Sequence, residues 1–122
     1  MKFITKKIHS YLDYPVAISL IALPFLLNLG ESNPIAFYLS VVVGFAALIL
    51  TILTDHQTGL FPVISYRLHL LVDGAVAVLF ILAPFIFSFE GIDAYFYWIN
   101  GAAVLLVVSL HKKEVQYPVM QA

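Results

Sequence analysis

The sequence predicts an all-α membrane protein with four transmembrane helices, arranged as two tandem two-helix hairpins related by an approximate two-fold axis along the membrane normal. Two observations carry this prediction. Apolar residues make up 62% of the chain and charged residues only 11%, against about 25% charged residues in soluble domains. The first half of the chain also resembles the second. We therefore expect one membrane domain over residues 1–122.

Four stretches of the chain are nearly free of charge. A helix needs about 20 residues to cross the hydrocarbon core, so the shorter stretches must take a turn from the polar residues beside them. The stretches lie at about residues 14–30, 34–54, 74–89 and 94–110. The first follows three lysines, as a signal peptide would, but Asp13 and Pro24 interrupt it. We expect it to be a retained helix.

The distribution of charge predicts the orientation of the helices. The two outer connections carry acids but no cations, namely Glu31, Glu90 and Asp93. Under the positive-inside rule, the ends of the chain and its middle connection then lie in the cytoplasm. We expect an integral protein of a prokaryotic cytoplasmic membrane, with the lipid bilayer as its main partner. The cations that support this orientation are Lys2, Lys6, Lys7, Arg67, Lys112 and Lys113.

A gapless internal repeat covers the first helix of each expected hairpin. Seven residues recur 60 positions later within a window of about seventeen, which indicates a duplicated structural unit. Repeat one spans about residues 8–56 and repeat two about residues 68–113. The recurring residues are His9, Asp13, Val16, Ala17, Ile21, Pro24 and Phe25, which return as His69, Asp73, Val76, Ala77, Ile81, Pro84 and Phe85.

A duplicated two-helix unit with a proline and an aromatic residue late in its first helix resembles the SPW-repeat family of small membrane proteins. That family is named for a Ser-Pro-Trp motif at this position. Here the motif reads Leu23-Pro24-Phe25 and Ala83-Pro84-Phe85, so only the proline is retained. The resemblance implies a membrane architecture of two repeats, and it supplies no catalytic residues.

Three further patterns concern helix packing. Small residues around Gly44 and Gly101 predict that the second and fourth helices approach closely. Pro24 and Pro84 are expected to shape the bundle. Aromatic residues near the predicted span ends indicate belts at the membrane interfaces. These aromatic residues are Tyr11, Tyr14, Phe37, Tyr38, Tyr66, Tyr95, Tyr97 and Trp98.

Composition excludes several classes of function. The chain has no cysteine, which excludes disulfides, thiolate metal sites and dithiol chemistry. It has no basic cluster with interleaved aromatics, so no nucleic-acid partner is expected. No nucleophile elbow, phosphate loop or dinucleotide fingerprint is present, so nothing specifies an enzyme. A transport function in so small a chain would require a homodimer or a larger membrane complex.

Two His-x-x-x-Asp pairs open the first and third expected helices: His9 with Asp13, and His69 with Asp73. Residues four apart share a helix face, so each pair presents an imidazole beside a carboxylate. The repeat symmetry can bring both pairs toward a common axis. Three residues that close the second and fourth helices at the same level are expected as supplementary ligands or as partners of the ligands: Asp55, His56 and His111.

Three functions fit this cluster. One is a divalent transition-metal site, because imidazole and carboxylate suit Zn, Mn, Fe or Ni. A second is a structural one, in which each Asp accepts a hydrogen bond from its own His in a structural or accessory subunit of a membrane complex. The third is a haem, quinone or proton site, where haem would need two facing histidines. We expect the metal site, with His9, Asp13, His69 and Asp73 as its ligands.

Overall fold

The apolar stretches form four helices in the computed structural model, which describes residues 6–54, 59–61 and 63–110. A turn-forming residue stands immediately before two of these helices: Pro34 before the second and Gly91 before the fourth. The helices are α1 (Lys6–Leu26), α2 (Ile35–Leu53), α3 (Tyr66–Ile86) and α4 (Ile92–Ser109).

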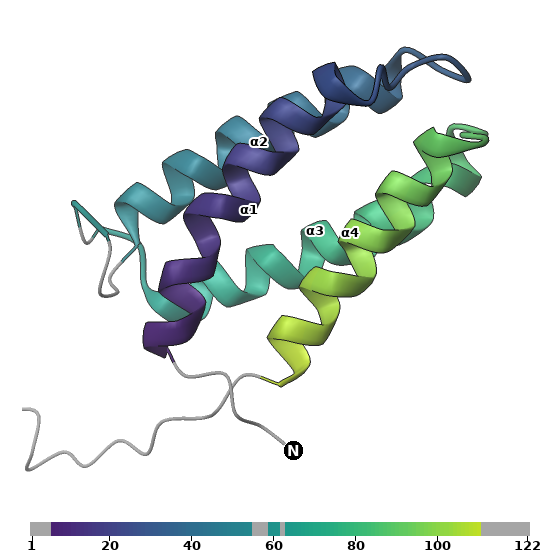
Figure 1. Cartoon of the computed structure of the whole chain (residues 1–122). Coiled ribbons are helices and arrows are strands. Elements are labelled where there is room, and N and C mark those ends of the chain that lie inside the picture. Colours follow the sequence, from purple (N-terminus) through teal and green to yellow (C-terminus); the bar gives the residue numbers. More distant parts are fainter. Residues whose placement is uncertain (1–5, 55–58, 62, 111–122) are drawn as a thin grey trace, which may run out of the picture.

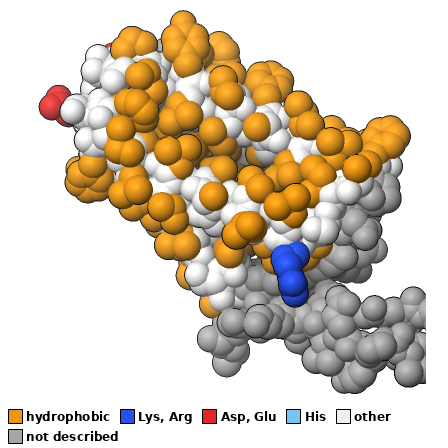
Figure 2. Space-filling model, turned by 180° about the vertical axis from the view of Figure 1, so that it is seen from behind, with side chains coloured by type: hydrophobic (Ala, Val, Ile, Leu, Met, Phe, Trp, Pro, Cys, Tyr) orange, Lys and Arg blue, Asp and Glu red, His pale blue; other side chains and the backbone are white. Residues whose placement is uncertain are grey.

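Three of these helices, α2, α3 and α4, are long and apolar enough to cross a membrane. Helix α1 is as long as α3, at 21 residues, but His9, Ser10 and Asp13 lower the hydropathy of its first half. Figure 2 shows a face covered largely by apolar side chains, with a cationic group at one end and acidic groups at the opposite end. Helices of this kind are typical of an integral membrane protein.

The helices form two hairpins. Helix α1 packs along α2, and α3 packs along α4. Figure 1 shows the two hairpin loops at one end of the molecule, while α1 and α3 both begin at the opposite end. We call the first the loop end and the second the His/Asp end. Because α1 and α3 run in the same direction, their first turns can meet at the His/Asp end.

Glycine allows close helix contact within each hairpin. A Cβ atom at Gly44 would lie 3.0 Å from the Ala17 carbonyl oxygen of α1, and one at Gly101 would lie 3.0 Å from the Ala77 carbonyl oxygen of α3. The expectation that these glycines join α2 to α4 is therefore wrong. Small residues let backbones approach, but here the partner of each glycine is the preceding helix of its own hairpin.

Helices α1 and α3 end in the same way. In α1 the Leu29 N–H donates to the Pro24 carbonyl at 3.0 Å, across Asn28 with φ of 51°. In α3 the matching bond also measures 3.0 Å, across Ser88 with φ of 56°. A left-handed residue that closes a bond of this span is the Schellman ending of a helix. Pro24 and Pro84 are both buried there, as the role expected of them in shaping the bundle requires.

Polar contacts join the two hairpins at the loop end. The Asp93 carboxylate is 1% exposed and accepts hydrogen bonds from the backbone N–H groups of Gly30 at 2.8 Å and Ser32 at 3.0 Å. The Tyr97 hydroxyl donates to the Ala36 carbonyl at 2.6 Å. Tyr97 is fully buried, so its expected place in an aromatic belt is wrong. The loop end therefore holds α4 against α2.

Substitution of the glycines tests this mode of helix contact. Gly44→Ala would place a Cβ 2.6 Å from Ile21 Cγ1, so we expect it to lower the free energy of unfolding by roughly 1–3 kcal/mol. Gly74→Ala is the matched control, because nothing lies within 4 Å of a Cβ there. It should leave stability unchanged or raise it by about 0.5–1 kcal/mol. Unfolding in detergent micelles measures both, and equal effects would contradict this account of the hairpin contact.

Candidate metal centre

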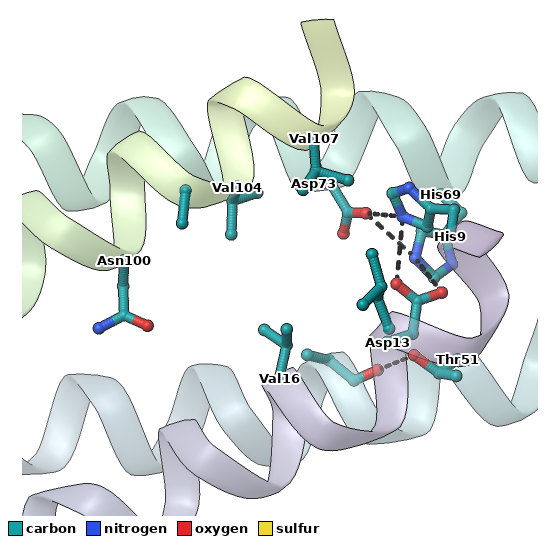
Figure 3. A pocket seen from close by; sticks show the side chains of 12 residues that line it. His9, Asp13, Val16, Thr51, His69, Asp73, Asn100, Val104 and Val107 are labelled. Atoms are coloured by element: carbon teal, nitrogen blue, oxygen red, sulfur yellow. Dashed lines mark hydrogen bonds and ion pairs between the residues drawn. The ribbon is translucent and has the colours of Figure 1, made fainter. Parts of the chain in front are cut away.

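Four side chains meet where α1 and α3 begin. His9 Nε2 lies 3.1 Å from Asp13 Oδ1 and 2.9 Å from Asp73 Oδ2. His69 Nε2 lies 3.3 Å from Asp13 Oδ2 and 3.2 Å from Asp73 Oδ2. Each histidine thus contacts the carboxylate of its own helix and that of the other hairpin (Figure 3). We call these four residues the His/Asp quartet.

The start of α3 is fixed by its cap. The Ser65 hydroxyl accepts a hydrogen bond from the Leu68 N–H at 3.2 Å, with ψ of 147° at Ser65. A serine at this position satisfies one of the N–H groups that a helix start leaves without a partner. The cap places His69 at the end of the first turn and Asp73 one turn later, on the face that meets α1.

Thr54, at the end of α2, holds the His69 ring. Thr54 Oγ1 lies 2.7 Å from His69 Nδ1 and 2.5 Å from the Leu50 carbonyl oxygen. A carbonyl oxygen can only accept, so the single hydroxyl proton goes to Leu50. His69 Nδ1 must then donate to Thr54. The Nε2 atom that faces the two carboxylates therefore carries a second proton or presents a lone pair to a cation.

The chain after α2 holds Thr54 in place. Thr54 and Ile64 pair as an isolated parallel β-bridge. The Ile64 N–H donates to the Leu53 carbonyl at 2.7 Å, and the Leu60 N–H donates to the Ile52 carbonyl at 2.9 Å. These bonds satisfy carbonyl groups that the end of a helix would otherwise expose. The connection between the hairpins thereby fixes the residue that orients His69.

An aromatic ring lies beside the histidines. Tyr66 stacks on His69, with ring centroids 6.3 Å apart and planes at 27°, and meets His9 edge to face at 5.9 Å. It stands three residues before His69, so the two share a helix face. From the sequence, Tyr66 was expected in an aromatic belt and its contact with the histidines was not predicted, although the spacing of three residues to His69 could have indicated it.

The quartet is largely withdrawn from solvent. His9 is 3% exposed and His69 1%, while the carboxylate side chains of Asp13 and Asp73 keep 10% and 19%. The two half-buried carboxylates carry two negative charges, and such charges are stable in an apolar surrounding only when cations balance them. Two imidazolium groups or one divalent metal ion would each supply this balance.

The structure brings together the four expected ligands, but it does not test the three residues expected as supplementary ligands. Asp55, His56 and His111 lie outside the residues that the structure describes, so their expected contribution stays a prediction. Within the described residues, the quartet is the one group of three or more His, Asp or Glu side chains whose ligand atoms could hold a metal ion. The role of Thr54 was not predicted from the sequence, because no local pattern indicates which side chain a hydroxyl at the end of a helix will contact.

Comparison of the chain with protein-family models, with curated proteins and with solved structures found no match.

Proposed function

We propose that the chain is an integral membrane protein with four spans that binds a divalent transition-metal ion between its two hairpins. The ligands are His9, Asp13, His69 and Asp73. One observation carries the proposal: a ligand atom from each of the four residues lies within 4.8 Å of the other three. Two helices from different hairpins contribute equally, so the ion would also join the hairpins.

The distances within the quartet support a small ion. The contacts between imidazole nitrogen and carboxylate oxygen measure 2.9, 3.1, 3.2 and 3.3 Å. In a tetrahedral zinc site with bonds of about 2.0–2.2 Å, neighbouring ligand atoms lie roughly 3.3–3.5 Å apart. These four imidazole–carboxylate contacts would therefore lengthen by only a few tenths of an ångström on binding, while all pairs of ligand atoms already lie within 4.8 Å.

The orientation of His69 supports the same conclusion. Histidines that bind metals usually donate their second ring N–H to a carbonyl, a carboxylate or another acceptor, which fixes the tautomer. His69 donates its Nδ1–H to Thr54 and turns Nε2 toward the carboxylates. A lone pair at Nε2 would repel the carboxylates unless a cation lay between them.

The donor set favours Zn, Mn, Fe or Ni. Two imidazoles and two carboxylates suit these ions, and the absence of cysteine disfavours Cu(I). Haem fits less well, because the Asp73 carboxylate oxygen lies within 3.2 Å of both imidazole Nε2 atoms, where a porphyrin plane would have to pass. The structural role is the main competitor, since the same distances suit hydrogen bonds between carboxylates and imidazolium groups.

A protein with four spans requires α1 to cross the membrane together with the three apolar helices. The polar residues that lower its hydropathy, His9 and Ser10, are buried, whereas Ile18 and Phe25 are exposed at 56% and 62%. Lipid would therefore meet an apolar face.

The two-fold relation between the hairpins, the duplication and the similarity to SPW-repeat proteins belong to this proposal. A homodimer or a larger membrane complex would not alter the ligand set.

Metal content tests the proposal. Protein purified in detergent without chelator should retain close to one metal ion per chain, measured by elemental analysis. The double variant His9→Ala/His69→Ala should lose it, because two of four ligands are gone. Added Zn²⁺, Mn²⁺, Fe²⁺ or Ni²⁺ should stabilise chelator-treated wild-type protein by roughly 2.7 kcal/mol at a hundred times the dissociation constant. A wild-type protein that is metal-free and insensitive to all four ions would support the structural role instead.

Thr54→Val tests how the metal ligand is oriented. The substitution keeps the shape of the side chain and removes the acceptor for His69 Nδ1–H, so we expect metal affinity to fall roughly 10- to 100-fold. Thr51→Val is the matched control, because Thr51 is buried in the same helix but donates to the Ala47 carbonyl of that helix. Titration of both variants with Zn²⁺ measures the difference. Equal affinities would remove Thr54 from the metal centre.

Membrane sidedness can be tested without background labelling, because the chain has no cysteine. With cations on one side, the positive-inside rule puts the loop end outside. Glu31→Cys and Glu90→Cys should react with a membrane-impermeant maleimide in intact cells. Leu60→Cys, which is 69% exposed in the middle connection, should react only after permeabilisation. The opposite pattern would place the quartet at the outer surface.

A further inference from the structure

The quartet forms one end of a cavity between the hairpins. The cavity has a volume of about 160 Å³ and receives side chains from all four helices. Its walls are apolar, and Val16 of α1 and Val104 of α4 extend into it from opposite sides in Figure 3. A space of roughly 150 Å³ is large enough for a benzene-sized molecule, and this one is partly open, because Leu12, Val16 and Ala103 of its lining are exposed. The walls therefore fit a small apolar body.

Asn100 supplies a polar group at the other end of the cavity (Figure 3). Its Nδ2 donates to the Phe96 carbonyl at 2.8 Å, which fixes the amide orientation because a carbonyl cannot donate. The amide oxygen accepts no hydrogen bond from the residues that the structure describes. Asn100 precedes Gly101, whereas the residue before Gly44 in the first hairpin is Val43. The Asn100 carboxamide is therefore not needed for the close glycine contact that both hairpins make.

The two ends of the cavity both offer acceptors. Asp13 and Asp73 line it with carboxylates, and Asn100 offers its carboxamide oxygen. A benzene ring with hydroxyl groups on opposite carbons carries one hydrogen-bond donor at each end. Its shape therefore matches an apolar cavity that has an acceptor at each end.

We propose that this cavity binds a small aromatic diol of the 1,4-quinol class, with one hydroxyl at the quartet and the other donating to the Asn100 carboxamide oxygen. Few, well-placed polar groups in an apolar cavity are typical of a specific ligand site. The proposal goes beyond metal binding, because a carboxylate oxygen can accept a hydrogen bond from the hydroxyl whether or not a metal is present. A lipid acyl chain would occupy the apolar space but would donate no hydrogen bond at either end of the cavity.

Two probes of nearly equal shape test the proposal. Hydroquinone carries a hydroxyl at each end, and p-xylene carries a methyl group in the same places. Calorimetric titration of the full chain in detergent, without oxygen, should show hydroquinone binding roughly tenfold or more tightly than p-xylene, because two hydrogen bonds are made. Equal affinities would show an apolar cavity open to acyl chains, and no binding of either probe would also overturn the proposal.

Variants locate the site. Asn100→Leu should weaken hydroquinone roughly three- to tenfold and leave p-xylene unchanged or tighter. Ala103→Leu, which fills the cavity wall, should weaken both probes at least tenfold. Ala102→Leu is its matched control, because Ala102 is exposed as Ala103 is but does not line the cavity. An unchanged hydroquinone affinity in both Asn100→Leu and Ala103→Leu would place binding elsewhere and overturn the proposal.

The same titrations separate this proposal from metal binding. They are run on metal-loaded and on chelator-treated protein. If no metal binds but the preference for hydroquinone persists and depends on Asn100, only the metal proposal fails. If the metal binds stoichiometrically but hydroquinone shows no preference over p-xylene, only the quinol proposal fails.

Discussion

Two half-buried carboxylates pair with two buried imidazoles between the hairpins, and this pairing decides how the hairpins meet. Asp73 lies in α3, a helix apolar enough to cross a membrane, and Asp13 lies beside it in α1, so an unpaired charge on either would be costly. Each contacts both His9 and His69, at 2.9 to 3.3 Å. Because the partners belong to different hairpins, satisfying these charges brings α1 and α3 together. The hairpins must then meet at the His/Asp end, whatever their other contacts are.

The two hairpins share the features that build a helix pair and differ in those that surround the site. Both place a glycine against the preceding helix, and both end their first helix with a left-handed residue. In contrast, Thr54 orients only His69, and Asn100 stands where the first hairpin has Val43. Where the structure describes both hairpins, the residues around the site therefore differ between them. This difference gives the cavity two different ends.

Local spacing predicted each His/Asp pair and the recurrence of the motif predicted that the two pairs meet, whereas the other contacts between distant segments were not predicted. The interval of four residues places His9 beside Asp13 and His69 beside Asp73 on their helices, and the duplication indicates that the pairs meet. The burial of Asp93 depends on backbone N–H groups of the other hairpin's loop, which no local pattern specifies. The partner of Gly44 was predicted wrongly for a similar reason: small residues indicate close approach but not which helix approaches.

In the proposed metal centre, four side chains from two hairpins share one cation. X-ray absorption at the K edge of Zn²⁺ bound to the purified protein reports the atoms around the ion. We expect nitrogen and oxygen donors at about 2.0–2.2 Å, with outer scattering from two imidazole rings. A shell of water oxygens without imidazole scattering would contradict it.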